Sequence, residues 1–171
     1  YQDTETNVLT YNNNTSTTTN NYDDAFSPRV GLIYQPTKNH TVFATYSNSF
    51  DVNTGADINN EPLKPSIIDQ YEVGFKNKLF KEIIQANITF YQINNNNLAQ
   101  TSLVDPNFKE LAGSIRSEGV EIDIITKPFN GLQIVAGYSF NETIYVKSNT
   151  YIEGSLLRYN PKNTANLSAN Y

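Results

Sequence analysis

The most constraining feature of this sequence is a pair of long alternating runs between Ile67 and Ile93. A period of two residues places their apolar side chains on one face of an extended chain and their polar side chains on the other. The few residues between the runs force the two strands to pair antiparallel. Each run is about ten residues long, the length that a tilted, bilayer-crossing strand needs. The alternating apolar positions are Tyr71, Val73, Phe75, Ile84, Ala86, Ile88 and Phe90.

The same alternation recurs along most of the chain and predicts about seven antiparallel strands between residues 26 and 171. Short connections at 36–40, 77–82 and 127–131 alternate with long ones at 52–66, 94–113 and 146–157. Tight turns at one end of a sheet and large loops at the other are typical of outer-membrane barrels. Five lysines lie in or beside the short turns, namely Lys38, Lys76, Lys78, Lys81 and Lys127.

The first 25 residues have a different composition, rich in Asn and Thr. Such a segment buries too little apolar area to offset the entropy lost on ordering. We therefore expect residues 1–25 to form a long, mobile extracellular loop, with the end of a strand near Val8 to Tyr11. The strands then occupy residues 26–171.

Composition excludes several classes of protein. The chain has a net charge of -5 and only three arginines, which argues against a nucleic-acid partner because phosphate binding needs concentrated Lys and Arg. The absence of cysteine excludes a disulfide framework and a thiolate metal site. No apolar run approaches the ~18 residues of a transmembrane helix.

The residues also predict no catalytic site. His40 is the single histidine and falls in a short turn, where we expect it to be solvated. Glu118 and Glu121 are three residues apart, which places them on opposite faces of a strand, so they cannot act as a paired acid and base. We therefore expect no catalytic residue, cofactor site or metal site, and we expect that the protein is not an enzyme.

Seven segments in order resemble the barrel part of TonB-dependent siderophore receptors, with matching spacing from about residue 26 to the end of the sequence. The segments are Phe26-Ser-Pro-Arg-Val-Gly-Leu-Ile-Tyr-Gln-Pro36, Val42-Phe-Ala-Thr-Tyr-Ser-Asn-Ser-Phe50, Leu63-Lys-Pro65, Gln70-Tyr-Glu-Val-Gly-Phe-Lys76, Ile115-Arg-Ser-Glu-Gly-Val-Glu121, Gly137-Tyr138 and Asn160-Pro161.

This resemblance implies an all-β fold, an antiparallel transmembrane β-barrel segment of about seven strands from a barrel of about 22. It implies an outer-membrane receptor of a Gram-negative bacterium that imports a ferric siderophore or a similar chelate. Its energy would come from a TonB-type coupling protein acting through a plug that has no counterpart in this sequence. A seven-stranded slice leaves two unpaired edges, so we expect the chain to fold only within a larger barrel in outer-membrane lipid.

If the resemblance holds, ligand contacts fall to the long loops and to the lumen-facing residues near them. The lumen candidates are Tyr91 and Ser117. The loop candidates are the aromatic residues Phe108 and Tyr151 and the cationic Arg158, which suits an anionic siderophore. These five residues are predicted from their location.

Two other interpretations of the sequence stay open. A soluble β-sandwich that serves as an adhesin or glycan-binding module also alternates inward apolar with outward polar residues. It predicts shorter strands, turns of mixed length at both ends and bulky residues that fill a core. A related receptor for haem, cobalamin or oligosaccharide is the second alternative.

Overall fold

The computed structural model describes the backbone of residues 2–12, 15–128 and 130–171 and the side chains of residues 26–128 and 130–171. This part of the chain contains no helix that is long and apolar enough to cross a membrane. Its strands are β1 (Gln2–Asn12), β2 (Thr15–Ala25), β3 (Arg29–Thr37), β4 (His40–Asp51), β5 (Ser66–Leu79), β6 (Ile84–Thr101), β7 (Lys109–Thr126), β8 (Gln133–Lys147) and β9 (Asn163–Asn170).

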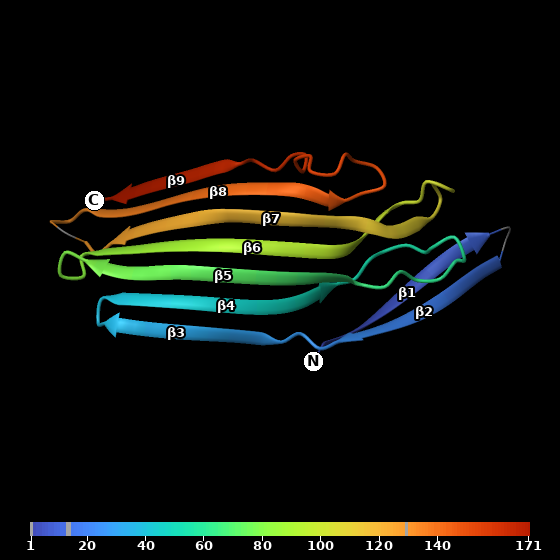
Figure 1. Ribbon diagram of the computed structural model, residues 1–171, viewed down its shortest axis with the longest axis horizontal. Coiled ribbons are helices and arrows are strands. Elements are labelled where there is room, and N and C mark those ends of the chain that lie inside the picture. Colours follow the sequence, from blue (N-terminus) through green and yellow to red (C-terminus); the bar gives the residue numbers. More distant parts are fainter. Residues whose placement is uncertain (1, 13–14, 129) are drawn as a thin grey trace.

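Strands β3 to β9 form one antiparallel sheet in which each strand pairs with its neighbours in sequence (Figure 1). The seven-stranded all-β architecture expected from the alternation is therefore confirmed. Residues 38–39, 80–83 and 127–132 connect strands at one end of the sheet, which we call the turn end. Residues 52–65, 102–108 and 148–162 connect them at the opposite end, the loop end. The turn 127–132 contains Phe129, which lies outside the described residues.

The strand register separates the sheet into two chemically different faces. Val73 pairs with Ala44 on one side and with Phe90 on the other, and these residues belong to the apolar face. Glu72 pairs with Thr45 and Tyr91, which belong to the polar face. The pairing of Phe90 with Val120 and of Val120 with Phe140 continues the apolar face across β7 and β8.

No second layer of described residues covers the apolar face. Leu32 is 74% exposed, Val73 46% and Leu167 77%, although all three are large hydrophobic residues. The buried hydrophobic side chains of the described part are Phe50, Leu63 and Tyr145, all at or beside the loop end. A soluble sandwich would bury this face in a core, so the apolar face requires an apolar environment that these residues do not supply.

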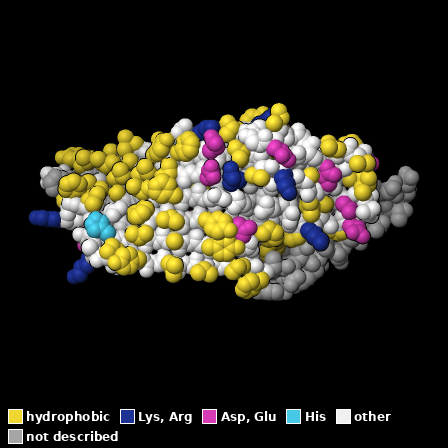
Figure 2. Space-filling view, in the orientation of Figure 1, with side chains coloured by type: hydrophobic (Ala, Val, Ile, Leu, Met, Phe, Trp, Pro, Cys, Tyr) yellow, Lys and Arg dark blue, Asp and Glu magenta, His cyan; other side chains and the backbone are white. Residues whose placement is uncertain are grey.

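The apolar face becomes polar toward the loop end. Figure 2 shows hydrophobic side chains gathered over the turn-end half of this face and charged side chains spread over the loop-end half. The charged groups include the ion pairs Arg116–Glu118 and Lys162–Glu142 and the Asp69 carboxylate, which accepts a hydrogen bond from Asn48. The hydrophobic residues therefore form a band of limited height.

The boundaries of the middle long loop differ from the prediction. We expected residues 94–113 to form a loop, but β6 and β7 continue through most of them and leave only 102–108 outside the strands. Asn94, Asn95 and Asn96 pair with Arg116, Ile115 and Ser114, and the register shifts beyond Asn96. The ladder is made by main-chain groups, so a run of asparagine can extend a strand without an apolar signal. The third long connection likewise spans 148–162 instead of 146–157.

The first 25 residues also contain more regular structure than expected. β1 and β2 pair antiparallel from Gln2 with Ala25 to Asn12 with Thr15, and this hairpin extends from the loop end of the sheet (Figure 1). Residues 1, 13 and 14 lie outside the described residues. Threonine favours strands, which accounts for pairing in a segment of low hydrophobicity. The mobility of this segment stays a prediction.

Two aromatic side chains on the polar face lie against glycines on the neighbouring strand. Phe43 pairs with Gly74, and Tyr91 pairs with Gly119. A Cβ atom at Gly119 would lie 2.8 Å from the Tyr91 Oη and would also clash with the Phe140 carbonyl oxygen. A Cβ atom at Gly74 would clash with the Phe43 ring. Both positions are restricted to glycine by close approach.

We predict that Gly119→Ala lowers the free energy of unfolding of the sheet by about 1–3 kcal/mol, because the backbone carbonyl of Phe140 cannot move aside. Urea unfolding of the folded protein measures this change. Gly31→Ala is the matched control, since its Cβ would meet its nearest neighbour, Thr45 Cγ2, at 3.4 Å. Equal losses in the two variants would contradict the close approach at Gly119.

Candidate functional site

The loop end is the part of the described chain where polar, aromatic and charged side chains from different connections meet. The connection between β4 and β5 is fastened by Asn53. Its Nδ2 donates to the carbonyl oxygens of Lys64 at 2.8 Å and Asn97 at 2.7 Å, and its Oδ1 accepts from the Ala99 amide at 3.3 Å. One side chain thus closes the base of its own loop and joins it to β6.

The connection between β8 and β9 is fastened to the β6–β7 pair by Asn149. The Asn149 amide nitrogen donates to Gln100 Oε1 at 3.0 Å, and its Nδ2 donates to the Thr101 carbonyl oxygen at 3.0 Å and to the Glu110 carboxylate. Gln100 Nε2 also donates to Ser148 Oγ at 3.1 Å. Both neighbouring connections are therefore tied to the long extensions of β6 and β7.

Three side chains at this end form a stack. The rings of Tyr145 and Tyr151 are 4.5 Å apart with an interplanar angle of 23°. The Arg158 guanidinium lies 5.4 Å from the centre of the Tyr151 ring. Tyr145 is 8% exposed and Tyr151 36%, so a buried ring supports an accessible one. This stack presents an aromatic surface and a cation together, groups that can bind a planar ligand and its anionic oxygens.

A network of hydrogen bonds on the polar face includes Thr143 and Asn160, each two residues away in sequence from a member of the stack. Thr143 Oγ1 donates to Ser117 Oγ at 2.9 Å, and Asn160 Nδ2 donates to Thr143 Oγ1 at 2.7 Å. Ser117 Oγ also donates to Asn141 Oδ1 at 3.0 Å. Tyr91 pairs with Gly119, two residues from Ser117 on the same face, so Tyr91 and Ser117 are diagonal neighbours on adjacent strands. Asn160 comes from the β8–β9 connection, so this loop is joined to the polar face as well.

A cavity of about 540 Å³ lies between the β4–β5 connection and the start of β7. Its volume is within the range of small-molecule sites, about 300–1,000 Å³. Its lining mixes apolar side chains with charges of both signs, which suits a ligand that carries both polar and apolar groups. The lining residues are Asp57, Ile58, Glu61, Pro62, Leu63, Lys64, Ser102, Val104, Lys109, Glu110 and Leu111.

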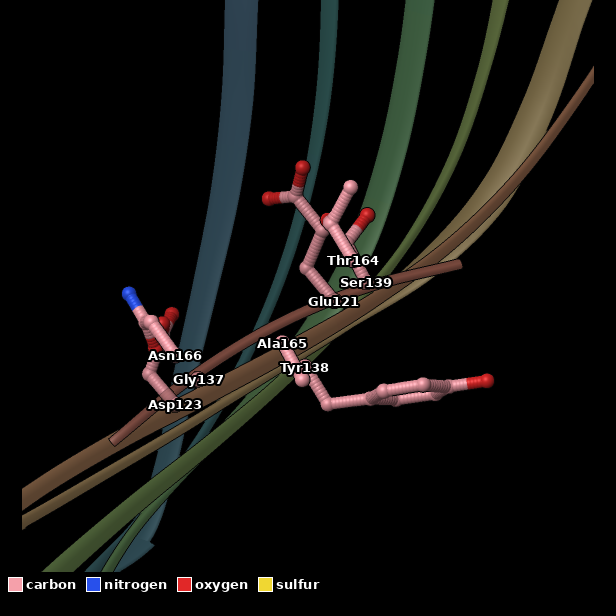
Figure 3. A pocket seen from close by; sticks show the side chains of 8 residues that line it. All are labelled: Glu121, Asp123, Gly137, Tyr138, Ser139, Thr164, Ala165 and Asn166. Atoms are coloured by element: carbon pink, nitrogen blue, oxygen red, sulfur yellow. The ribbon is translucent and has the colours of Figure 1, made fainter. Parts of the chain in front are cut away.

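A second hollow of about 290 Å³ lies on the polar face nearer the middle of the strands. Figure 3 shows Glu121, Ser139 and Thr164 on one side of the sheet, while the Tyr138 ring points to the opposite side. This arrangement agrees with the register, in which Glu121 pairs with Ser139 and Ser139 with Thr164. Within the described part, no group of three or more His, Cys, Asp or Glu side chains could hold a metal ion.

The structure brings four of the five predicted ligand residues into two pairs. Tyr91 and Ser117 are diagonal neighbours on the polar face of β6 and β7, and Arg158 lies over Tyr151 in the β8–β9 connection. Phe108 joins neither pair. Its carbonyl oxygen accepts from the Ser102 amide and its own amide donates to the Asp105 carbonyl oxygen, so it closes the β6–β7 turn.

Sequence reasoning missed the residues that hold these candidates in place. Tyr145 was not singled out, although it lies just before the predicted connection 146–157, and β8 continues past it to Lys147. The alternation from Asn141 through Thr143 places Tyr145 on the polar face. Asn53 and Asn149 carry no comparable signal, since each is one asparagine among many in polar segments.

Comparison with known proteins was made on sequence and on structure. The family model described as TonB dependent receptor-like, beta-barrel, matches residues 1–171. The ferric-pyoverdine 358 receptor of Pseudomonas putida is 29% identical over 68% of this chain and 15% of its own length. The ferrioxamine B receptor of Salmonella typhimurium is 28% identical over 85% of this chain and 20% of its own length. The chain thus spans about a fifth or less of these relatives.

The solved structures show the same fold. The crystal structure of the siderophore receptor PiuA from Acinetobacter baumannii superimposes with a TM-score of 0.78 and 19% identity, covering 98% of this chain and 26% of PiuA. At this identity the likeness concerns the fold alone. It places the seven strands of this chain among the strands of a larger receptor structure.

We predict that Asn149→Ala releases the β8–β9 connection, because it removes the side-chain hydrogen bonds to Thr101 and Glu110. Limited trypsin digestion of the folded protein measures the release as faster cleavage after Arg158, by about tenfold for a loss of about 1.4 kcal/mol. The control is Glu153→Ala, an exposed substitution in the same connection. Unchanged cleavage in Asn149→Ala would show that other contacts hold the loop.

Proposed function

This chain belongs to the TonB-dependent receptor β-barrel family, and we propose that it forms part of the wall of an outer-membrane receptor that imports a ferric siderophore. The observation that carries this proposal is the sheet itself, which has an exposed apolar face and a hydrogen-bonded polar face. The family consists of transport receptors and not of enzymes.

The two faces suggest how the sheet sits in the membrane. The apolar face contacts lipid, because exposing a band of large hydrophobic residues to water is unfavourable. The polar face lines the lumen, where Thr45 donates to Glu72 at 2.8 Å and Gln70 donates to Glu72 at 2.7 Å. We place the loop end outside the cell and the turn end in the periplasm, since short turns face the periplasm in such barrels.

The cargo proposed for this receptor is a ferric siderophore. The relatives with matching sequences are named for ferric pyoverdine and for ferrioxamine B, both of them iron chelates. In this chain, the stack of Tyr151 and Arg158 offers an aromatic surface and a cation at the loop end. We propose that Tyr151 and Arg158 contact the chelate first, and that Tyr91 and Ser117 line its path along the polar face.

The remaining partner is the energy-coupling protein. In the proposed mechanism a TonB-type protein in the periplasm supplies the energy for import and acts on a part of the receptor outside residues 1–171. The iron ion is cargo here, and its ligands are atoms of the siderophore. The chain's own residues bind the outer surface of the chelate and provide one wall of its passage.

The soluble sandwich considered as an alternative fits the structure less well. It requires a second layer over the apolar face, and that face of the seven-stranded sheet β3 to β9 is exposed. Haem, cobalamin or oligosaccharide as cargo finds no support in the names of the two sequence relatives compared above.

The orientation of the sheet in lipid predicts opposite tolerances at two adjacent residues. Ile88 lies on the apolar face and pairs with Phe75 and Ile122, whereas Thr89 lies on the polar face and pairs with Gly74 and Glu121. Ile88→Lys should lower the free energy of unfolding in lipid vesicles by about 2–4 kcal/mol, the cost of a lysine facing lipid at the midplane.

Thr89→Lys serves as the matched control, with the same charge at the same depth but on the polar face. We expect it to change stability by less than about 1 kcal/mol, because the lysine meets water and the Glu121 carboxylate. The free energy of unfolding of both variants is measured by urea titration of the refolded receptor, with heat-modifiable gel migration as the readout of the folded fraction. Equal tolerance of the two lysines would contradict a lipid-facing apolar face.

The ligand contact predicts a loss of affinity in loop variants. Tyr151→Ala and Arg158→Ala should each weaken binding of the cognate ferric siderophore by about tenfold or more, which corresponds to about 1.4 kcal/mol. Arg158→Lys should bind more tightly than Arg158→Ala, because lysine keeps the charge. It should still bind more weakly than the unchanged receptor, because lysine lacks the planar stacking group. Binding to cells that express the receptor, measured with radioactive iron, tests this.

Glu153→Ala, in the same connection, is the control and should bind normally. If all three variants of Tyr151 and Arg158 bind like the unchanged receptor, the stack is not a ligand contact. That result would not contradict the proposed membrane barrel, which the Ile88→Lys and Thr89→Lys variants test separately.

A further inference from the structure

The cavity of about 540 Å³ at the loop end has a rim of large hydrophobic side chains that face water. Ile58 is 52% exposed and Val104 is 79% exposed, and both line the cavity. Leu63, Pro62 and Leu111 supply further apolar wall. All five lie on or between β4 and β7, so their exposure does not arise at the open edges of the sheet. Exposed apolar residues grouped around a concave surface mark a binding site.

The two exposed rim residues are held in place by tight turns. Beside Ile58, the Asp57 amide donates to the Glu61 carbonyl oxygen at 2.9 Å, and the Asp57 carboxylate accepts from the Glu61 amide at 2.9 Å. The Val104 amide donates to Ser102 Oγ at 3.2 Å. A rim that is already ordered loses little entropy when a ligand enters the cavity.

Most of the charged groups in the cavity wall are engaged elsewhere. The Asp57 carboxylate accepts amide hydrogen bonds within its own turn, and Lys109 Nζ donates to Thr101 Oγ1 at 3.0 Å. The Glu110 carboxylate accepts from Asn149 Nδ2. The remaining two charged lining residues have opposite signs. The cavity therefore offers a ligand mainly apolar surface, together with the methylene stems of its lysines.

The acyl chains of membrane lipids are separated from this cavity by a polar zone. The hydrophobic band ends before the loop end, and charged side chains lie between (Figure 2). They include the ion pairs Arg116–Glu118 and Lys162–Glu142. An alkyl chain in the cavity therefore belongs to a molecule that approaches from the loop end and not to the surrounding bilayer.

The cavity adjoins the connection that carries the aromatic and cationic stack. Glu110 lies in the cavity wall, and its carboxylate accepts the hydrogen bond from Asn149 of the β8–β9 connection. Tyr151 and Arg158 belong to the same connection. An apolar cavity is thus continuous with the segment proposed to contact the chelate.

We propose that the cavity binds the alkyl chain of an amphiphilic ferric siderophore, one that carries a fatty acyl tail, while the iron-binding head contacts Tyr151 and Arg158. The inference rests on the proposed function and names the class of its cargo. The buried alkyl chain covers Ile58 and Val104 and removes their apolar surface from water.

The test compares iron chelates that differ only in their acyl group. One pair of probes is ferrioxamine B acylated on its terminal amine with acetyl or octanoyl, and a second pair is a catecholate chelator acylated in the same way. All carry radioactive iron, and binding is measured with the whole receptor in outer-membrane vesicles. In at least one pair, we expect the octanoyl probe to bind about tenfold more tightly than the acetyl probe.

Ile58→Asp and Val104→Asp should each abolish this gain, because a carboxylate at the rim opposes entry of an alkyl chain. Both side chains are exposed, so neither change disturbs a packed core. Ile152→Asp is the matched control and should keep the gain, since Ile152 is 81% exposed and lies outside the cavity lining. Tyr151→Ala should weaken the acetyl and octanoyl probes by the same factor, because Tyr151 contacts the head.

Equal binding of the acetyl and octanoyl probes would overturn the inference and leave iron-chelate binding intact. A gain that persists in Ile58→Asp and Val104→Asp would reflect partition into the membrane, and it would also overturn the inference. If no probe binds, an octanoyl chain contributes no affinity and the inference is wrong. The proposed siderophore function is then tested separately, by the binding of the cognate ferric siderophore to the Tyr151 and Arg158 variants.

Discussion

The constraint on which the rest of this structure depends is the pairing of main-chain groups in a sheet one layer thick. Every strand from β4 to β8 has a neighbour on both sides, so its amide and carbonyl groups are satisfied within the sheet. Only such a backbone can face hydrocarbon, where no water replaces a missing hydrogen bond. The side chains on the two faces can then differ in polarity, and this difference produces the two-residue period of the sequence.

The two ends of the sheet differ in the length and the anchoring of their connections. At the turn end, connections of a few residues keep the strands in register and carry lysines. At the loop end, the strands continue beyond the hydrophobic band, and the long connections fold onto β6 and β7 through Asn53 and Asn149. The Tyr151–Arg158 stack, which we propose as a ligand contact, thereby stands on an anchored loop, and anchoring lowers the entropy that a loop loses when it binds a ligand.

Much of the fold could be predicted from the sequence, because the two-residue period is strong wherever one face is apolar. Val73, Ile88 and Val120 share a face as expected, and the long and short connections alternate as expected. The prediction failed where strands leave the hydrophobic band: Asn94 to Asn96 are paired, yet nothing in their side chains marks a strand. Ladder bonds between main-chain groups carry no residue signature.

The candidate site was predictable only in part for a related reason. Tyr151 and Arg158 could be selected singly as an aromatic and a cation in a long loop, but their stacking on Tyr145 depends on how that loop folds back. The anchoring asparagines could not be identified from the sequence, because most of their partners are main-chain atoms distant in sequence. A pattern of residue types cannot reveal such partners.

The bonds made by Asn53 and Asn149 also bear on how receptors of this kind can diversify. Both side chains donate to carbonyl oxygens of the main chain, those of Lys64, Asn97 and Thr101. A carbonyl oxygen survives any substitution of its residue. The exposed positions between these fastening points can therefore change in sequence while the loops keep these bonds to the sheet.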